Sequence, residues 1–467
     1  MSIQLIIILL YLLVTIGIGV YAKKKSVSSD AFHGAGLGVL MCVAAGTGEW
    51  LGGTSTTGVS EYGYMFGISG AWYTIANGLG VMVLGLFFAK LYRSLDTVTV
   101  PGVLGSFVGQ QARTVASILL IFVMIAVGTA QIIAAGTLGV TVLKLNFTLS
   151  VIALGIGFII YTLAGGMTAV GYTNIMHLCA MYGGVFFAVM YVISKAGGFQ
   201  QVHQQLPASY FSFTTIGMPK VSSWLIASIL GACTAQAGIQ PILAAKDVHV
   251  AKKSAIITAC VVAPFGIFTA LLGMAAKIKF DALANAKLAL PTLLMNLPPI
   301  IGGIVLSTIL AAILSTVSPI ILACGTMFTK DIYQKLINPS ATDTQMLKIS
   351  RLTTGLAGGI CILLSLVLYG STAILDIVYF AYTLRGSLFV VLLFAIYWKK
   401  TSTKGAIWAM LLTALTGFLW ILFKKITGHY PIHPMLTETY ISVIVAFIST
   451  FILSTLFPED QRSPKTR

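Results

Sequence analysis

The chain has 467 residues, of which 57% are hydrophobic and only 9% are charged, and its mean hydropathy is +0.96. A soluble globular domain carries roughly 25% charged residues, so 12 acids and 28 Lys and Arg residues cannot cover a soluble globule of this size. Lipid must be the solvent for most of the chain. This composition excludes a soluble enzyme, a nucleic-acid-binding protein and a disulfide-stapled secreted domain, although a net charge of +16 alone would suggest nucleic acid.

Apolar runs of about 18 residues or more, bounded by charges or by Gly and Pro clusters, predict about thirteen transmembrane helices. In chain order they cover residues 3–22, 36–60, 67–92, 115–142, 148–165, 171–195, 222–241, 254–276, 298–328, 349–369, 373–397, 405–424 and 438–457. A β-barrel is the poorer alternative, because its strands alternate apolar and polar residues and these runs are apolar on every face. We expect an all-α membrane protein with one transmembrane domain, residues 1–457, and a cytoplasmic tail, residues 458–467.

The positive charges orient these helices. No basic segment precedes the first span, which is followed by Lys23, Lys24 and Lys25, so we expect a retained helix with its N-terminus outside rather than a cleaved signal peptide. Thirteen spans then leave 19 Lys and Arg residues on the cytoplasmic side and 8 on the other, with Arg385 inside a span. This bias obeys the positive-inside rule and predicts a multi-pass protein of the cell (inner) membrane with a cytoplasmic C-terminus.

No residue pattern indicates catalysis or nucleotide binding. All six cysteines lie within expected spans and none forms a CxxC pair, so we expect them to pack in the core. The absence of an HExxH motif, of paired acids on one helical face and of a P-loop argues against a membrane enzyme and against transport driven directly by ATP. A channel is disfavoured because the few intramembrane polar residues gather at one level instead of lining a pore.

Two of the expected spans are poor as continuous helices. Residues 44–53 (AAGTGEWLGG) place four glycines and a carboxylate at mid-membrane depth. Since glycine costs about 1 kcal/mol relative to alanine inside a helix, this stretch predicts unwound backbone, and residues 231–241 form a second weak stretch. Unwound backbone in a bilayer must line a cavity, so a polar solute is expected to bind at these breaks. Close helix packing at the glycines is the alternative for either stretch alone.

The positions of the two weak stretches suggest an internal repeat. If residues 36–195 form a first repeat of five helices and residues 222–397 a second, each repeat begins with a Gly-interrupted helix. Because five is odd, the two repeats run in opposite directions, which is the five-plus-five inverted-repeat arrangement of secondary transporters. Residues 3–22 and 405–457 would then be peripheral helices.

Several motifs in this order resemble those of the sodium:solute symporter family. They are residues 165–174 (GGMTAVGYTN, against its GG-x-x-AV-x-x-TD signature), 240–246 (QPILAAK, against QR-x-x-AAK), 311–318 (AAILSTVS, against AA-x-x-ST-x-S), 331–333, and 397–406 after the eleventh span. The resemblance covers nearly the whole chain. It implies thirteen helices with the first outside the repeat, and import of a small organic solute coupled to sodium.

The resemblance also implies a sodium site between the first broken helix and the ninth span. It maps to the backbone carbonyls of Ala45 and Gly48, the carbonyl of Ala312 and the hydroxyls of Ser315 and Thr316. Sodium is a hard cation, and unwound carbonyls beside a Ser-Thr pair offer it neutral oxygens near the membrane centre. The alternative for the Ser-Thr pair is hydrogen bonding to the preceding turn of its own helix.

This chain departs from the family pattern at three positions. Asn174 stands where the signature has an aspartate, which removes a negative charge from the cation route and predicts that one sodium is coupled. His177, one helical turn later, stands where the family commonly has a glutamine. It could partner Asn174 or, alternatively, carry a coupling proton. Pro241 replaces the arginine of the QR turn, so no role of that arginine transfers to this chain.

Glu49 and Arg385 are the charges with the greatest expected cost. A charge at mid-bilayer costs a few kcal/mol even on the mildest scales and normally faces a partner or a wet cavity. Three interpretations compete: the two pair with each other, they clamp a zwitterionic or carboxylate-bearing solute through the planar fork of Arg385, or Glu49 assists cation binding. Asp376 is too far along the helix from Arg385 to be its direct partner.

Other candidates for lining the solute cavity combine an apolar face with a polar handle, although such residues also serve packing and the interfacial belt. They are Trp50, Thr54, Trp72, Tyr73, Asn77 and Gln236. We therefore expect sodium-coupled symport; the alternative is a sodium-independent or proton-coupled transporter, or a channel, of the same fold. The expected partners are a small solute, sodium and the lipid bilayer, without nucleic acid or nucleotide, in a monomer or loose homo-oligomer.

Overall fold

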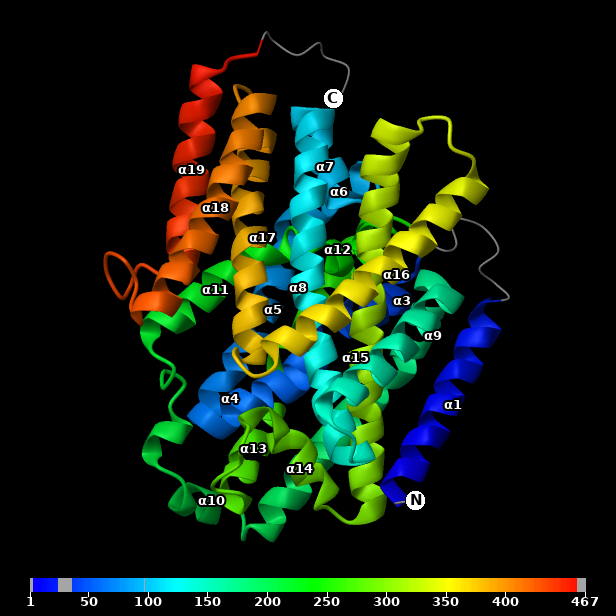
Figure 1. Ribbon diagram of the computed structural model, residues 1–467, viewed down its shortest axis with the longest axis vertical. Coiled ribbons are helices and arrows are strands. Elements are labelled where there is room, and N and C mark those ends of the chain that lie inside the picture. The colour runs from blue at the N-terminus through cyan, green and yellow to red at the C-terminus, as the bar shows by residue number, and fades with distance from the viewer. Residues whose placement is uncertain (1–2, 24–35, 96, 460–467) are drawn as a thin grey trace.

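The computed structural model describes residues 3–23, 36–95 and 97–459 (Figure 1). The described chain is almost wholly helical and contains no strand, only an isolated bridge between Leu37 and Ala245. Ten of its helical stretches are long and apolar enough to cross a membrane. These observations confirm the expected all-α, multi-span class.

The helices include short π and 3-10 segments, labelled η. In chain order they are α1 (Ile3–Lys23), α3 (Val39–Trp50), η1 (Thr54–Gly58), α4 (Val59–Phe66), η2 (Gly67–Ala71), α5 (Trp72–Val83), η3 (Leu84–Phe88), α6 (Ala89–Ser94), α7 (Val100–Val108), α8 (Gln110–Leu143), α9 (Phe147–Lys195), α10 (Phe199–Gln205), η4 (Ala208–Phe211), α11 (Met218–Ala232), α12 (Gln236–Leu243), α13 (Val248–Lys279), η5 (Ala286–Leu288), α14 (Ala289–Met295), α15 (Pro299–Met327), η6 (Phe328–Ile337), α16 (Asp343–Leu368), α17 (Ile374–Tyr397), α18 (Thr403–Thr427) and α19 (Glu438–Leu456).

The count of thirteen transmembrane helices remains a prediction. Helix α9 runs without interruption through the two spans expected at residues 148–165 and 171–195, and residues 54–94 form one long helical stretch. Figure 1 places the beginning of α1 and the end of α19 at opposite ends of the bundle, as an odd number of crossings requires. The repeat boundaries likewise stay predictions.

Both weak stretches are broken. Helix α3 ends at Trp50, and helical structure resumes at Gly53 after two non-helical residues. A Cβ atom on Gly52 would lie 2.2 Å from the Thr316 hydroxyl oxygen, so only glycine lets the backbone approach α15 here. The second break separates α11 from α12 at residues 233–235. Each stretch expected to be weak therefore contains an interruption, although the second falls on residues 233–235, none of which is glycine.

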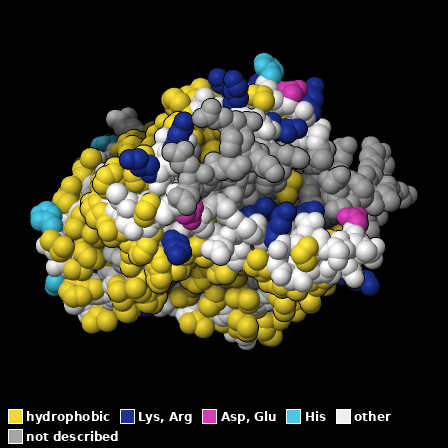
Figure 2. Space-filling model, turned by 90° about the horizontal axis from the view of Figure 1, so that it is seen from above, with side chains coloured by type: hydrophobic (Ala, Val, Ile, Leu, Met, Phe, Trp, Pro, Cys, Tyr) yellow, Lys and Arg dark blue, Asp and Glu magenta, His cyan; other side chains and the backbone are white. Residues whose placement is uncertain are grey.

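The breaks lie inside the bundle, surrounded by α5, α8, α13, α15 and α17. Helix α15 is buried along most of its length and contacts α1, α3, α8, α9 and α16. Helices α18 and α19 pack against each other and against α17 at one edge, whereas α1 lies at the opposite edge (Figure 1). In the end view, hydrophobic side chains form the flank, and Lys and Arg side chains gather near the end of the bundle (Figure 2).

Candidate solute and sodium sites

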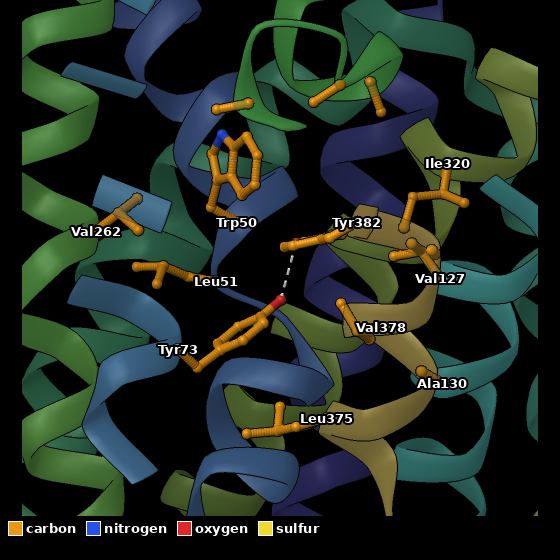
Figure 3. Close-up of a cluster of buried hydrophobic side chains, with 14 of the residues drawn as sticks. Trp50, Leu51, Tyr73, Val127, Ala130, Val262, Ile320, Leu375, Val378 and Tyr382 are labelled. Atoms are coloured by element: carbon orange, nitrogen blue, oxygen red, sulfur yellow. Dashed lines mark hydrogen bonds between the residues drawn. The ribbon is translucent and has the colours of Figure 1, made fainter. Parts of the chain in front are cut away.

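The two helix breaks meet in the middle of the bundle. The ring of Trp50, the last residue of α3, lies so close to Gly238 of α12 that a Cβ atom there would be 2.9 Å from the ring. Trp50 also meets Tyr382 of α17 edge-on, with 6.4 Å between the ring centroids. Figure 3 shows Trp50, Tyr73 and Tyr382 around the first break. Each broken helix therefore contributes to one aromatic-lined region.

A chain of hydrogen bonds ties the first break to α5, α8 and α17. Gln131 of α8 accepts the backbone N–H of Gly53 at 2.7 Å and donates to the Thr54 hydroxyl at 3.1 Å. The Thr54 hydroxyl lies 2.8 Å from the Tyr73 hydroxyl, which lies 3.2 Å from that of Tyr382. Gln131 thus satisfies backbone freed at the break, as a bilayer core requires. Sequence reasoning missed Gln131 and Tyr382; a lone glutamine inside an apolar span was the available signal for the first.

Arg385 lies beside the second break. The Thr234 hydroxyl, from the non-helical stretch, donates to the backbone carbonyl of Arg385 at 2.6 Å. The guanidinium carbon sits 3.9 Å from the centroid of the Tyr382 ring and 5.4 Å from that of Trp50. These cation–π contacts hold a fully buried guanidinium, only 1% exposed, against the two aromatic rings.

Direct pairing of Glu49 with Arg385, one of the three interpretations, is not formed as an ion pair within the described residues. Neither residue belongs to any of the four ion pairs in the described part of the chain. Instead, one carboxylate oxygen of Glu49 and two nitrogens of Arg385, Nε and Nη2, are buried without a hydrogen-bond partner. Nε and Nη2 of Arg385 therefore stay without a polar partner even though the Trp50 and Tyr382 rings lie against the guanidinium. Asp376 pairs with Lys220 at 3.0 Å, so it is not the partner of Arg385 either.

Four of the five predicted sodium-site residues come together where α3 crosses α15. The Thr316 hydroxyl donates to the carbonyl oxygen of Gly48 and lies 3.0 Å from that of Ala312. The Ser315 hydroxyl donates to the Ala312 carbonyl at 2.8 Å. Both hydroxyls therefore bond to the preceding turn, as the alternative interpretation expected, and Thr316 additionally reaches the broken helix. Ala45 is buried on α3 one turn before Gly48.

A small cavity of about 10 Å³, the size of roughly one water molecule, adjoins this cluster between α3, α9 and α15. Gly48, Ala312 and Ser315 line it together with Asn174 and His177 of α9. Both polar atoms of the Asn174 amide are buried without a partner, and the amide lies directly against Gly48. The two coupling candidates thus face the predicted sodium ligands, which sequence spacing alone could not establish.

His177 does not bond to Asn174 as the spacing had suggested. Its Nδ1 atom lies 3.0 Å from the hydroxyl of Tyr11 on α1, and its Nε2 atom has no partner. The correction has a simple cause, because α1 packs against α9 and brings a competing hydroxyl to the ring. The first helix, expected to be peripheral, therefore reaches a residue of the cavity.

A model of the sodium:solute symporter family matches residues 32–413, which is most of the chain. The chain belongs to the sodium:solute symporter family. It is a transmembrane symporter and not an enzyme, and membership of the family supports sodium as its coupling ion.

Relatives of this chain are named for different solutes. The chain is 24% identical to a sodium/glucose cotransporter of Vibrio parahaemolyticus, over 98% of this chain and 91% of the relative. It is 25% identical to the osmoregulated proline transporter OpuE of Bacillus subtilis, over 96% of both, and 27% identical to the human high affinity choline transporter 1, over 91% of this chain and 76% of the relative. Such variety leaves the solute of this symporter open.

Solved structures of related proteins show the same fold. A Na+-coupled sialic acid symporter, captured in a substrate-bound outward-open state, superposes with a TM-score of 0.79 at 19% identity and covers 99% of both chains. MhsT in complex with L-phenylalanine superposes with a TM-score of 0.59 at 14% identity, over 89% of this chain and 98% of its own.

Three further predicted liners of the symporter have different environments. Asn77 of α5 is completely buried with both amide atoms unpartnered, as a residue awaiting a polar ligand would be. The Trp72 indole instead donates to the backbone of Phe213 in an exposed contact, away from the breaks. Gln236 is also engaged elsewhere: its amide accepts the N–H of Val100 and donates to the carbonyl of Val98. It fastens the segment before α7 instead of offering its amide to a solute.

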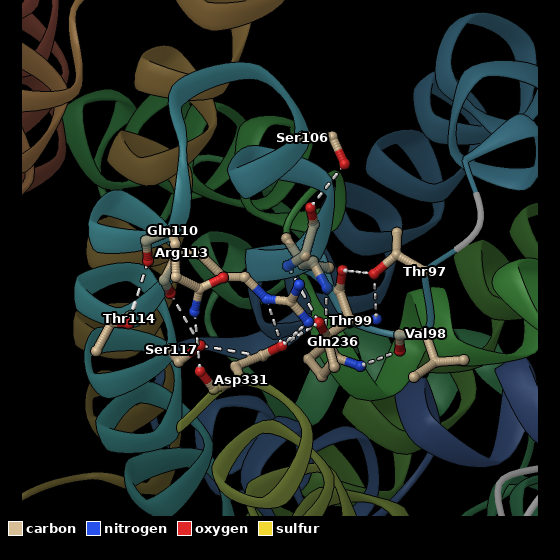
Figure 4. A network of polar contacts seen from close by, with 12 residues as sticks. Thr97, Val98, Thr99, Ser106, Gln110, Arg113, Thr114, Ser117, Gln236 and Asp331 are labelled. Carbon is tan, nitrogen blue, oxygen red and sulfur yellow. Dashed lines mark hydrogen bonds and ion pairs between the residues drawn. The ribbon is translucent and has the colours of Figure 1, made fainter. Parts of the chain in front are cut away.

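The same segment belongs to a polar network near the beginning of α8 (Figure 4). Asp331 in η6 is fully buried and pairs with Arg113 of α8. Its carboxylate also accepts the hydroxyls of Thr99 at 2.9 Å and Ser117 at 3.0 Å. Asp331, which lies just after α15, therefore joins two other parts of the chain: α8 and the segment that precedes α7. This acid of the family motif thus has a structural role.

Proposed function

We propose that this symporter imports a zwitterionic or carboxylate-bearing solute together with sodium by alternating access. The observation that carries the proposal is the pair of buried charges at the helix breaks whose polar edges have no partner, Glu49 and Arg385. An unpaired buried charge costs several kcal/mol. A solute that carries a carboxylate for Arg385 and a cationic group for Glu49 would satisfy both charges.

The aromatic surroundings support the same solute class. The Trp50 and Tyr382 rings make cation–π contacts with the Arg385 guanidinium, and its unpartnered Nε and Nη2 atoms can donate the two parallel hydrogen bonds that a carboxylate accepts. Tyr73 and the unpartnered amide of Asn77 add polar atoms on the α5 side. A small site with apolar walls and a few polar groups is typical of small-molecule binding.

We also propose that sodium binds at the contact between α3 and α15. The carbonyl oxygens of Gly48 and Ala312 and the hydroxyls of Ser315 and Thr316 are the neutral oxygens that a hard cation prefers. Because Asn174 supplies no carboxylate to the adjoining cavity, we infer that one sodium is coupled. The sodium dependence of uptake should then have a Hill coefficient near one, and a clear value near two would contradict this inference.

A thermal-shift screen tests the solute class. Purified protein is heated with sugars, amino acids, organic acids and vitamins, each with sodium and with potassium. Because a ligand stabilises the state that binds it, the transported solute should raise the melting temperature only when sodium is present. Stabilisation by uncharged sugars alone would overturn the assignment to Glu49 and Arg385.

A further inference from the structure

A groove of about 510 Å³ lies at one end of the bundle, between the ends of α9 and α13 and the short helices α10 and α14. None of the residues that line it belongs to the predicted solute or sodium sites. Helix α9 ends at Lys195 and helix α13 ends at Lys279. Because both lysines line the groove, the last turns of the two helices lie at the same surface of the molecule.

The wall that α13 forms is apolar along its depth, whereas Gln205 and Asn296 bring amide groups to other parts of the lining. Helix α13 contributes Leu271, Ala275 and Ile278, which follow one face of the helix at spacings of four and three residues. Leu293 on α14 and Leu297 just after that helix form another side of the groove. From Leu271 to the end of α13 at Lys279 is eight residues, or about 12 Å along the helix axis. A hydrocarbon chain of a lipid leaflet can follow such a wall into the membrane.

The rim is positively charged. Lys195 and Lys279 line the groove and are both exposed, and neither takes part in an ion pair within the described ranges. Lysines at helix ends place their stems along apolar surface and their amines at the level of the lipid head groups. Two unpaired amines above an apolar slot match a ligand with an anionic head and a hydrocarbon tail.

We propose that this groove binds one anionic phospholipid, with its phosphate at Lys195 and Lys279 and an acyl chain along the Leu271 face of α13. A soluble anion would leave the apolar wall unused. A zwitterionic phospholipid carries a cation that two lysines would repel, whereas the amines can make charge-assisted hydrogen bonds to the phosphate oxygens of an anionic lipid without that repulsion.

The test measures lipid binding to the full-length protein in detergent by native mass spectrometry, with thermal stability as a second readout. The probes are phosphatidylglycerol, phosphatidylcholine and inorganic phosphate. Lys195→Gln/Lys279→Gln removes the rim charge, and Lys252→Gln/Lys253→Gln is the matched control, because it removes the same charge near the opposite end of α13. Ile278→Trp fills the groove without changing charge.

We expect the wild type and the control pair to bind one phosphatidylglycerol at least tenfold more tightly than phosphatidylcholine. The rim variant should lose that preference, and Ile278→Trp should weaken both lipids while the protein keeps its melting temperature. Equal binding of the two lipids by the wild type would overturn the proposal. So would equal losses in the rim and control variants, or stabilisation by inorganic phosphate that matches phosphatidylglycerol.

Discussion

The hydroxyl of Thr316 on α15 donates a hydrogen bond to the carbonyl oxygen of Gly48, close to the end of α3. This contact joins a long buried helix to the half-helix that precedes the first break. A sodium ion bound here would need the lone pairs of the same two oxygens, so the hydroxyl hydrogen would have to turn away. Occupation of the proposed sodium site would therefore be coupled to the contact between α3 and α15 through this pair of atoms.

The first prediction concerns the sodium ligands. Ser315→Ala/Thr316→Ala should raise the sodium concentration needed for half-maximal stabilisation or uptake about tenfold or more, equivalent to about 1.4 kcal/mol. Ser307→Ala is the matched control, because this buried serine lies on the same helix and bonds only to the preceding turn, at the Gly303 carbonyl. An unchanged sodium requirement in the double variant would remove these hydroxyls from the site.

The second prediction separates the role of Arg385 from simple charge. Lysine keeps the charge but lacks the planar fork, so Arg385→Lys should weaken binding of a carboxylate solute tenfold or more. Arg93→Lys at the end of α6, where the guanidinium bonds to a backbone carbonyl, is the control and should leave solute affinity unchanged. The measurement is a solute titration of thermal stability in saturating sodium.

Glu49 should affect only part of the solute range. If its carboxylate holds the cationic group of a zwitterion, Glu49→Gln should weaken zwitterionic solutes and spare simple carboxylates. An equal loss for both kinds of solute in the same titration would argue that Glu49 acts on the cation site instead.

The third prediction uses the close approach of Gly48 to α9. A Cβ atom at this position would lie 2.1 Å from the Asn174 amide nitrogen, so Gly48→Ala must displace the Asn174 side chain or α3 itself. We expect sodium-dependent stabilisation to be lost in Gly48→Ala and restored in Gly48→Ala/Asn174→Ala, where the obstructing amide is gone. Gly359→Ala, which adds a methyl group in open space, is the control. Failure of the second substitution to restore the sodium response would show that the clash lies elsewhere.

The fourth prediction concerns stability. Asp331 is fully buried and paired with Arg113, and removing one partner of a buried pair typically costs about 3–5 kcal/mol because the other charge is left uncompensated. Asp331→Ala should lower the melting temperature strongly, and Asp281→Ala, in a pair with Lys277 whose acid is 91% exposed, should change it little. Similar shifts for the two variants would contradict the assigned role of the buried network.

The weak stretches in the sequence predicted the regions in which the helices break. This was possible because glycine lowers helix stability at its own position, whatever the rest of the fold. The sequence could not predict which side chains meet at the breaks. Gln131 accepts the N–H of Gly53, and the Tyr382 hydroxyl lies beside that of Tyr73, through helices far apart in the chain. Gln236, predicted to line the cavity, instead bonds to the backbone of Val98 and Val100. Tyr11 reaches His177 for the same reason: tertiary packing chooses the partner of a buried polar group, and composition does not.

The central claim is tested most directly by uptake into proteoliposomes of the solute that the stability screen identifies. An inward sodium gradient should drive its accumulation above the outside concentration, an equal potassium gradient should not, and Ser315→Ala/Thr316→Ala should shift the response to higher sodium. Accumulation that is the same in sodium and in potassium would contradict sodium-coupled symport by this protein.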